Sequence, residues 1–147
     1  MKGYLLDTNV ILITAPAKSV RDQTVLDWLE VRSDSLFLSV VTIAEIESGI
    51  ATAARKEALR KATSLTAWLE AILQLYGRRV LSLDTTIART AGCLDDFARS
   101  AGMSPGFADI AIAATASTHG LIILTRDLRH FQPLGLSVLD PLGGSLP

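Results

Sequence analysis

Short apolar segments alternate with longer segments of helical periodicity along the whole chain. An apolar run of three to five residues that follows a helix-ending glycine or a polar break favours a strand. Strands separated by helices pair in parallel, and the helices then cover both faces of the sheet. The fold expected for residues 1–147 is therefore one domain, a three-layer α/β/α sandwich with a mostly parallel central sheet. Its expected strands cover residues 4–6, 36–40, 80–83, 121–125 and 136–139.

Capping residues predict where the intervening helices begin and end. Ser19 is a candidate N-cap, and Thr42 with Glu45 matches a capping box, in which each side chain accepts from the other residue's backbone N–H. Asp84 is a further candidate N-cap, and Gly77 is suited to end a helix. The expected helices cover residues 21–32, 42 to about 50, 55–76, 84–102 and 104–120.

Composition and charge exclude several classes of protein. About half of the residues are hydrophobic (49%), which is enough for one core, and no apolar stretch is long enough to cross a membrane. The net charge of −1 argues against a protein that binds polyanions through bulk electrostatics. A single cysteine, Cys93, excludes an internal disulfide and a cysteine-rich zinc site. No signal peptide is evident before Asp7, so a cytoplasmic protein is expected.

Four carboxylates stand near the points where apolar strands end. Asp7 and Asp127 follow expected strands, and Glu45 and Asp109 are expected in the first turns of helices. If the strands are parallel, all four acids converge on the edge where open α/β sheets place their ligands. Carboxylates in one cleft repel each other and are costly to desolvate, so a divalent cation is their natural partner. This pattern indicates metal-dependent phosphoryl chemistry.

Each acid also has a purely structural interpretation. Asp7 is a good helix N-cap, the capping box accounts for Glu45, and Asp127 could cap a turn or pair with Arg129. Asp109 is harder to explain, because its helix is apolar on nearly every side and a buried charge requires a partner. Four such acids at one sheet edge make the shared functional interpretation the stronger one.

The sequence around these acids resembles a known family, the PIN-domain ribonucleases, and within it the VapC and FitB-like toxins of bacterial type II toxin–antitoxin pairs. The similar segments cover nearly the whole chain in the same order. They are Leu-Leu-Asp-Thr-Asn-Val at 5–10, Thr-Ile-Ala-Glu-Ile at 42–46, Phe-Ala-Asp-Ile-Ala-Ile-Ala-Ala-Thr-Ala at 107–116 and Leu-Thr-Arg-Asp at 124–127.

The resemblance implies a Mg²⁺- or Mn²⁺-dependent endoribonuclease that hydrolyses phosphodiesters through a metal-activated water to a 5′-phosphate and a 3′-hydroxyl. It also implies a small antitoxin protein as partner, and relatives commonly form homodimers. Relatives sometimes carry Asn at the fourth acidic position, so the transfer of a metal role to Asp127 has the weakest basis.

Residue roles follow from this chemistry. Asp7 and Asp109 are the expected principal metal ligands, while Glu45 completes the shell or positions water and Asp127 assists or holds a second ion. Asn9 and Thr125 stand beside acids and could orient them through hydrogen bonds, although both are also ordinary turn residues.

Two basic groups are candidates for contacts with phosphate. Each could equally be an ordinary solvated surface. The first is Arg126, Arg129 and His130 beside Asp127, and the second is Arg55, Lys56, Arg60 and Lys61 before the long helix.

A set of apolar side chains has two interpretations. It could form a groove for an antitoxin's amphipathic segment or simply pack in the core, and core packing is favoured. The set is Trp28, Leu29, Ile46, Ile50, Trp68 and Leu69.

Two rival functions are open. A haloacid-dehalogenase-type phosphatase also begins with an aspartate after an apolar strand, but it needs a second aspartate where this chain has Asn9. A catalytically silent PIN-like module that binds RNA or protein would not need to retain four mutually repelling acids. The sequence does not indicate which RNA would be cut.

Overall fold

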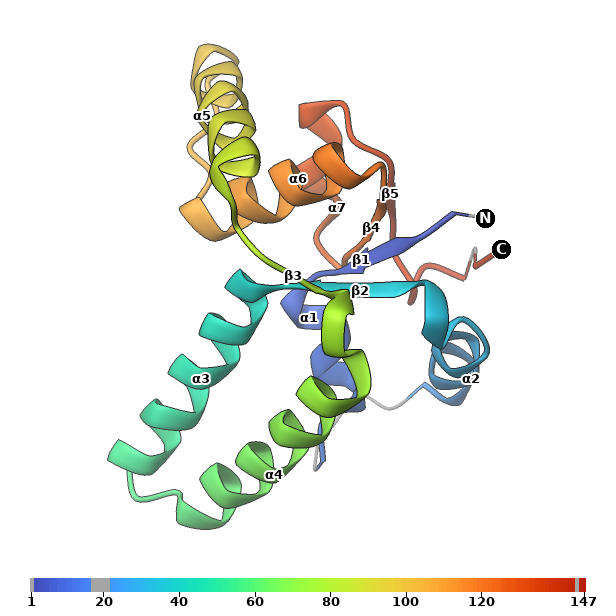
Figure 1. Ribbon diagram of the computed structural model, residues 1–147, viewed down its shortest axis with the longest axis vertical. Coiled ribbons are helices and arrows are strands. Elements are labelled where there is room, and N and C mark those ends of the chain that lie inside the picture. The colour runs from blue at the N-terminus through green and yellow to red at the C-terminus, as the bar shows by residue number, and fades with distance from the viewer. Residues whose placement is uncertain (1, 17–21, 145) are drawn as a thin grey trace.

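The computed structural model describes residues 2–16, 22–144 and 146–147. Five parallel strands form one sheet in the order β3-β2-β1-β4-β5 (Figure 1). The expected parallel sheet is confirmed, and all of its pairs are parallel. The strands are β1 Tyr4–Leu6, β2 Leu36–Ser39, β3 Val80–Leu81, β4 Ile122–Leu124 and β5 Val138–Leu139.

Helices connect the strands and cover both faces of the sheet. They are α1 Thr8–Ile11, α2 Gln23–Val31, α3 Val40–Arg55, α4 Leu59–Tyr76, α5 Thr85–Ser100, α6 Phe107–His119 and α7 Leu128–Phe131. Short 3₁₀ turns cover Leu12–Thr14, Ser33–Ser35, Gly77–Arg79 and Gln132–Leu134. Among the described residues, no helix is long and apolar enough to cross a membrane.

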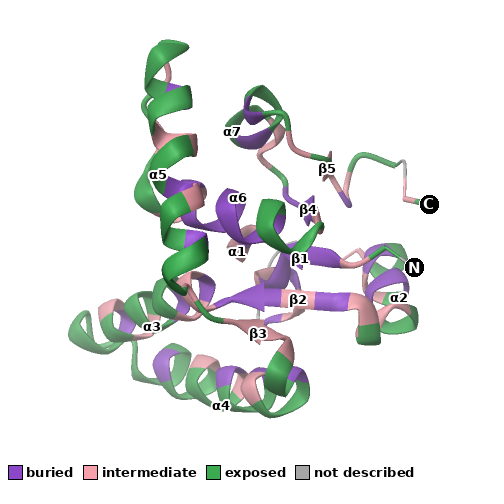
Figure 2. Ribbon diagram, turned by 45° about the horizontal axis from the view of Figure 1, so that its top comes forward, coloured by how far each residue is buried: buried purple, intermediate pink, exposed green. Residues whose placement is uncertain are grey.

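The two faces of β1 belong to two hydrophobic cores. Successive side chains of a strand point to opposite faces, so Tyr4 and Leu6 pack with α1 to α4, whereas Leu5 packs with α5 to α7. Figure 2 shows that buried residues lie in the central strands and along α6, and that the outer surfaces of the helices on either side are exposed. The three-layer arrangement expected from the sequence is confirmed.

The apolar side chains of α2, α3 and α4 serve the first core. Trp28, Leu29, Ile46 and Leu69 are buried in it, while Ile50 and Trp68 are partly buried against it. The Trp28 ring meets Tyr4 edge-on, with the ring centroids 5.0 Å apart. The favoured interpretation of this set as core packing is therefore confirmed.

The expected capping box at Thr42 and Glu45 is wrong. Helix α3 begins at Val40, and its N-cap is Ser39, whose hydroxyl accepts from the Val41 N–H at 3.1 Å. Glu45 consequently lies in the second turn rather than the first. The β-branched pair Val40 and Val41 favours strand by propensity, but Ser39, the last residue of β2, supplies a cap there.

Other helix ends also differ from the expected ones. Helix α3 continues through Arg55, and α4 begins at Leu59 after a break in which Glu57 adopts a φ of 60°. Helix α2 begins after its N-cap Asp22, while Ser19 lies outside the described residues. Asp84 caps α5 as predicted, and α6 ends at the expected place with Gly120 as its C-cap, but it begins at Phe107 and not at residue 104. The two long helices α3 and α4 run side by side and extend away from the sheet (Figure 1).

Candidate active site

Asp7 lies at the carboxyl end of β1, where its carboxylate is held on both oxygens. It is the N-cap of α1, and its Oδ1 accepts from the Thr8 N–H at 2.8 Å. Its Oδ2 accepts from the hydroxyl of Thr125 at 2.8 Å. Thr125 directly follows β4, the parallel neighbour of β1, and is fully buried. The pairing of these two strands therefore fixes the orientation of a carboxylate that is only 7% exposed.

Glu45 is joined to Asp7 through Thr8. The Thr8 hydroxyl donates to Glu45 Oε1 at 2.6 Å, while the Thr8 backbone N–H donates to Asp7 Oδ1. The hydroxyls of Thr8 and Thr42 lie 3.2 Å apart. Since the single hydrogen of Thr8 is directed to Glu45, the buried Thr42 can donate its own hydrogen to the Thr8 oxygen. Sequence reasoning predicted Thr42 only as a helix cap and did not single out Thr8, although a hydroxyl directly after a strand-end aspartate was a usable signal for Thr8.

Asp109 lies in the first turn of α6, after the N-cap Gly106. The following residues of that helix are buried from Ile110 to Ala116, as its composition predicted. The Asp109 side chain is 26% exposed, and its Oδ2 lies 2.9 Å from Nδ1 of His130. His130, proposed from the sequence as a phosphate contact, thus contacts an acid of the site.

Burial and two neighbouring acids act on the ionisation of Asp7. Burial raises the pKa of the Asp7 carboxyl above its usual range, and the hydrogen bonds from Thr125 and Thr8 oppose this. The negative charges of Asp109 and Glu45 raise the Asp7 pKa further. Asp109 and Glu45 are thus the acids whose charges reach Asp7.

Asp127 stands apart from this group. Its side chain makes no capping bond to α7, is 42% exposed, and has Oδ1 3.7 Å from Nη2 of Arg129. Only its backbone reaches the site, through an N–H that donates to the Thr125 hydroxyl at 3.0 Å. Asn9 likewise contacts backbone, since its Oδ1 accepts from the N–H of Arg126 at 3.2 Å. Asn9 therefore ties α1 to the loop after β4 without touching an acid.

The acids supply the donor atoms that Mg²⁺ and Mn²⁺ prefer, namely hard carboxylate oxygens. Within the described ranges, however, no three acidic, histidine or cysteine side chains converge closely enough to form a ready metal site. Asp7 carries a desolvated, repelled charge that a cation would offset. The donor chemistry thus fits a divalent cation, and the side chains would have to draw together to hold it.

Comparison with known proteins places the fold in a family. Residues 4–133 match the model of the PIN domain. The chain is 35% identical over 139 residues to VapC ribonuclease Y4jK of Sinorhizobium fredii, and 31% identical over 141 residues to Toxin FitB of Neisseria gonorrhoeae. Each alignment covers 93% of this chain and 96% of the relative.

A solved structure agrees with these relatives. The crystal structure of FitAcB from Neisseria gonorrhoeae superposes with a TM-score of 0.82 at 32% identity. The superposition covers 95% of this chain and 99% of that one. Likeness in sequence and in fold therefore extends over nearly the full length of both proteins.

Proposed function

The chain belongs to the PIN-domain family, and from that premise we propose that it is an endoribonuclease acting as the toxin of a type II toxin–antitoxin pair. Its relatives VapC ribonuclease Y4jK and Toxin FitB support this at more than 30% identity over most of the chain. The observation that carries the proposal is the buried Asp7 carboxylate at the carboxyl end of β1, which Thr8 and Thr125 hold on both oxygens and which the charges of Asp109 and Glu45 repel.

Asp7 and Asp109 would be the principal ligands of a Mg²⁺ or Mn²⁺ ion, with Glu45 completing the set and Asp127 assisting from the rim. Such an ion, when bound, acidifies a water for attack on a phosphodiester and offsets charge on the phosphate oxygens. The products would be a 5′-phosphate and a 3′-hydroxyl.

The protein's own side chains prepare this chemistry by restricting the acids. Hydrogen bonds to both oxygens keep the Asp7 carboxylate in one orientation, so its side chain loses little conformational entropy when a ligand binds. Thr8 does the same for one oxygen of Glu45, whose side chain is exposed and free to accept a proton from water at its second oxygen. His130 restricts Asp109 in the same way, with its Nδ1 2.9 Å from Oδ2 of the carboxylate.

We expect the basic residues after β4 to bind phosphates beside the scissile bond. Arg129 has a side chain that is 85% exposed, and Arg126 is also exposed. Long cationic side chains on a rim position a nucleic acid without reading its sequence. We expect them to contribute to affinity and not to the choice of cleavage site.

An antitoxin is the expected protein partner. We also expect a homodimer, which light scattering would detect as twice the 15.7 kDa of one chain.

The proposal is tested by incubating the purified protein with a mixed structured RNA pool, with Mg²⁺, with Mn²⁺ and with EDTA. We expect cleavage only with metal, and 5′-phosphate ends that accept ligation to an adaptor. Asp7→Asn and Asp109→Asn should each abolish cleavage, since each removes a negative donor.

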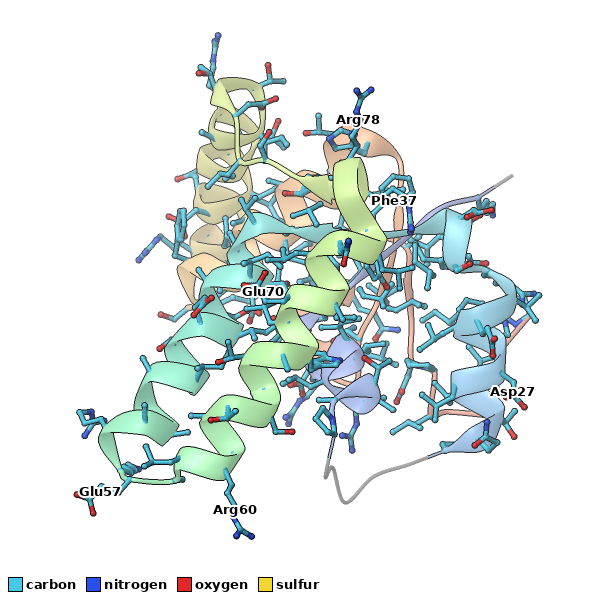
Figure 3. All side chains as sticks on the ribbon, turned by 60° about the horizontal axis from the view of Figure 1, so that its bottom comes forward. Asp27, Phe37, Glu57, Arg60, Glu70 and Arg78 are labelled. Atoms are coloured by element: carbon cyan, nitrogen blue, oxygen red, sulfur yellow. The ribbon has the colours of Figure 1, made fainter. Side chains whose placement is uncertain are left out.

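Asp27→Asn is the matched control, because Asp27 is an exposed aspartate on α2 (Figure 3) whose carboxylate accepts from Gln23 of the same helix. It should cleave like the wild type. Cleavage that persists in EDTA or survives in both site variants would disprove the metal-dependent mechanism. A wild type that neither cleaves RNA nor binds metal by calorimetry would leave a silent PIN-like binding module.

A further inference from the structure

A groove of about 750 Å³ leads from the acidic site to the outer end of the α3–α4 pair. Thr8 and Glu45 line its inner end, and Arg60 and Lys61 line its outer end. Its walls are mixed, with Ser64 and Gly49 beside apolar side chains. The groove therefore joins a catalytic acid to a pair of cations on a different helix.

The two cations are available to a ligand. Arg60 and Lys61 are exposed, and neither makes an ion pair among the residues that the structure describes. Figure 3 shows the Arg60 side chain extending from the first turn of α4. The other basic pair of this region, Arg55 and Lys56, is exposed at the end of α3 but does not line the groove. The four residues therefore do not form one uniform basic surface.

We propose that Arg60 and Lys61 bind backbone phosphates of the RNA strand, which lies in the groove with its scissile phosphate at Asp7, Glu45 and Asp109. This proposal rests on the proposed ribonuclease function. With a net charge of −1 the protein has no bulk attraction for RNA, so affinity must come from local cations. A polynucleotide matches both ends of the groove, because one strand offers a phosphate to the acids and further phosphates to the cations.

An acidic polypeptide would fit the outer end alone. Its carboxylates would be repelled by Glu45 at the inner end of the groove. The mixed charge along one groove thus favours RNA over an acidic protein segment.

The test is steady-state cleavage of a short fluorophore–quencher single-stranded RNA of mixed sequence by the full chain with Mn²⁺, over a series of KCl concentrations. The double variant Arg60→Gln/Lys61→Gln removes two phosphate contacts. For single strands each contact contributes about 0.7 to the salt slope, so the slope should fall by about 1.4 and KM should rise roughly 25-fold at ~0.1 M salt. The kcat should stay unchanged, because neither residue touches the reacting phosphate.

Arg55→Gln/Lys56→Gln is the matched control, with the same residue types and the same change in charge. It should leave KM within about twofold of the wild type at ~0.1 M salt, since residual long-range attraction is screened. An equal rise of KM in both double variants would mean general electrostatics and would overturn the proposal. An unchanged KM, with loss of a polypeptide that co-purifies with the wild type, would assign the groove to a protein and also overturn it.

A second pair of variants tests the groove without altering charge. A Cβ at Gly49 meets nothing within 4 Å, so a side chain there can enter the groove. Gly49→Phe should raise KM by obstruction, and Gly49→Ala should not. A Gly49→Phe variant with a normal circular dichroism spectrum and an unchanged KM would contradict the proposal that RNA lies in the groove. A wild type that cuts no RNA under any metal condition would instead refute the proposed function itself.

Discussion

Asp7 combines a restricted geometry with an unfavourable charge. Burial first, and then repulsion by Asp109 and Glu45, raise its pKa above the ordinary value of 3.8, against the hydrogen bonds that lower it. A carboxyl whose pKa is raised by folding makes the folded state less stable as the pH rises from 3.8 through the raised value. Without metal, Asp7→Asn should therefore increase the free energy of unfolding at neutral pH, where the wild-type group is ionised.

Urea unfolding in EDTA at acidic and neutral pH measures this effect. The wild type should lose stability between the two pH values, and Asp7→Asn should lose less. Asp27→Asn, exposed on α2, should shift stability by no more than about 0.5 kcal/mol. A lower neutral-pH stability in Asp7→Asn than in the wild type would show that its hydrogen bonds outweigh its desolvation.

Thr125 is the residue through which β4 controls Asp7. Its buried hydroxyl donates to Asp7 and accepts from the Asp127 N–H. Thr125→Val keeps the volume but removes both bonds, so Asp7 is less well oriented, and we expect an approximately 10- to 100-fold loss in kcat or metal affinity. Calorimetric titration with Mn²⁺ and cleavage kinetics measure the two quantities.

Thr125→Ser supplies the comparison, because it keeps the hydroxyl and loses only a methyl group. It should retain most of the activity. Wild-type kinetics and metal affinity in a correctly folded Thr125→Val would refute the orienting role.

Thr125 and Thr8 show how much of the site can be predicted from single residues. Thr125 stands beside Asp127 at a strand end, so an acid-orienting role could be predicted from the sequence, but the acid to which its hydroxyl donates is Asp7 on β1. The bond from Thr8 to Glu45 joins residues 37 apart and depends on the angle at which α3 leaves β2. No local sequence pattern encodes that angle. The incorrect capping-box prediction also gave Glu45 a local partner, Thr42, in place of Thr8.

At the scale of elements, Arg79 connects the end of α4 to β2. Its guanidinium donates to the backbone carbonyls of Ser33, Leu36 and Leu75, and it lies 4.8 Å from the centre of the Tyr76 ring. Arg79→Met leaves those carbonyls without their donor, and we expect it to lower the free energy of unfolding by about 2–4 kcal/mol. Since β2 carries Ser39, the cap of the Glu45 helix, this link also supports the site.

Chemical denaturation of Arg79→Met beside Arg78→Met measures this contribution. Arg78 is adjacent and exposed, pointing away from the fold (Figure 3), so its substitution should cost less than about 0.5 kcal/mol. Equal costs for the two variants would contradict the connecting role.

Element ends were the least predictable part of the fold. Gly77, with a φ of 53°, ends α4 as expected, because glycine adopts this conformation readily. The predicted start of α3 was wrong because Ser39, and not Thr42, is its N-cap, although both are good capping residues. Capping preferences identify the candidate N-cap residues, and the residue at which the strand ends determines which of them is used.

At the scale of the whole molecule, the parallel sheet could be predicted because each helical segment returns the chain in the same direction. The strand order could not, since it depends on which face each crossover covers. That order places β1 between β2 and β4, which brings Asp7 beside both Thr125 and the start of α3. The site is thus a product of topology, and Asp127, in the loop after β4, is joined to it through its backbone N–H, which donates to Thr125.

If the molecule is a toxin ribonuclease, its expression without an antitoxin should arrest the growth of a bacterial host. Induction should reduce colony counts for the wild type and leave them unchanged for Asp109→Asn, because the variant keeps the fold but lacks a principal donor of the site. Arg60→Gln/Lys61→Gln should be less toxic than Arg55→Gln/Lys56→Gln at equal protein levels, since only the first pair lines the groove. Colony counts together with immunoblots of each variant measure this. Arrest by Asp109→Asn at wild-type protein levels would indicate toxicity without catalysis, and would contradict the ribonuclease as its cause.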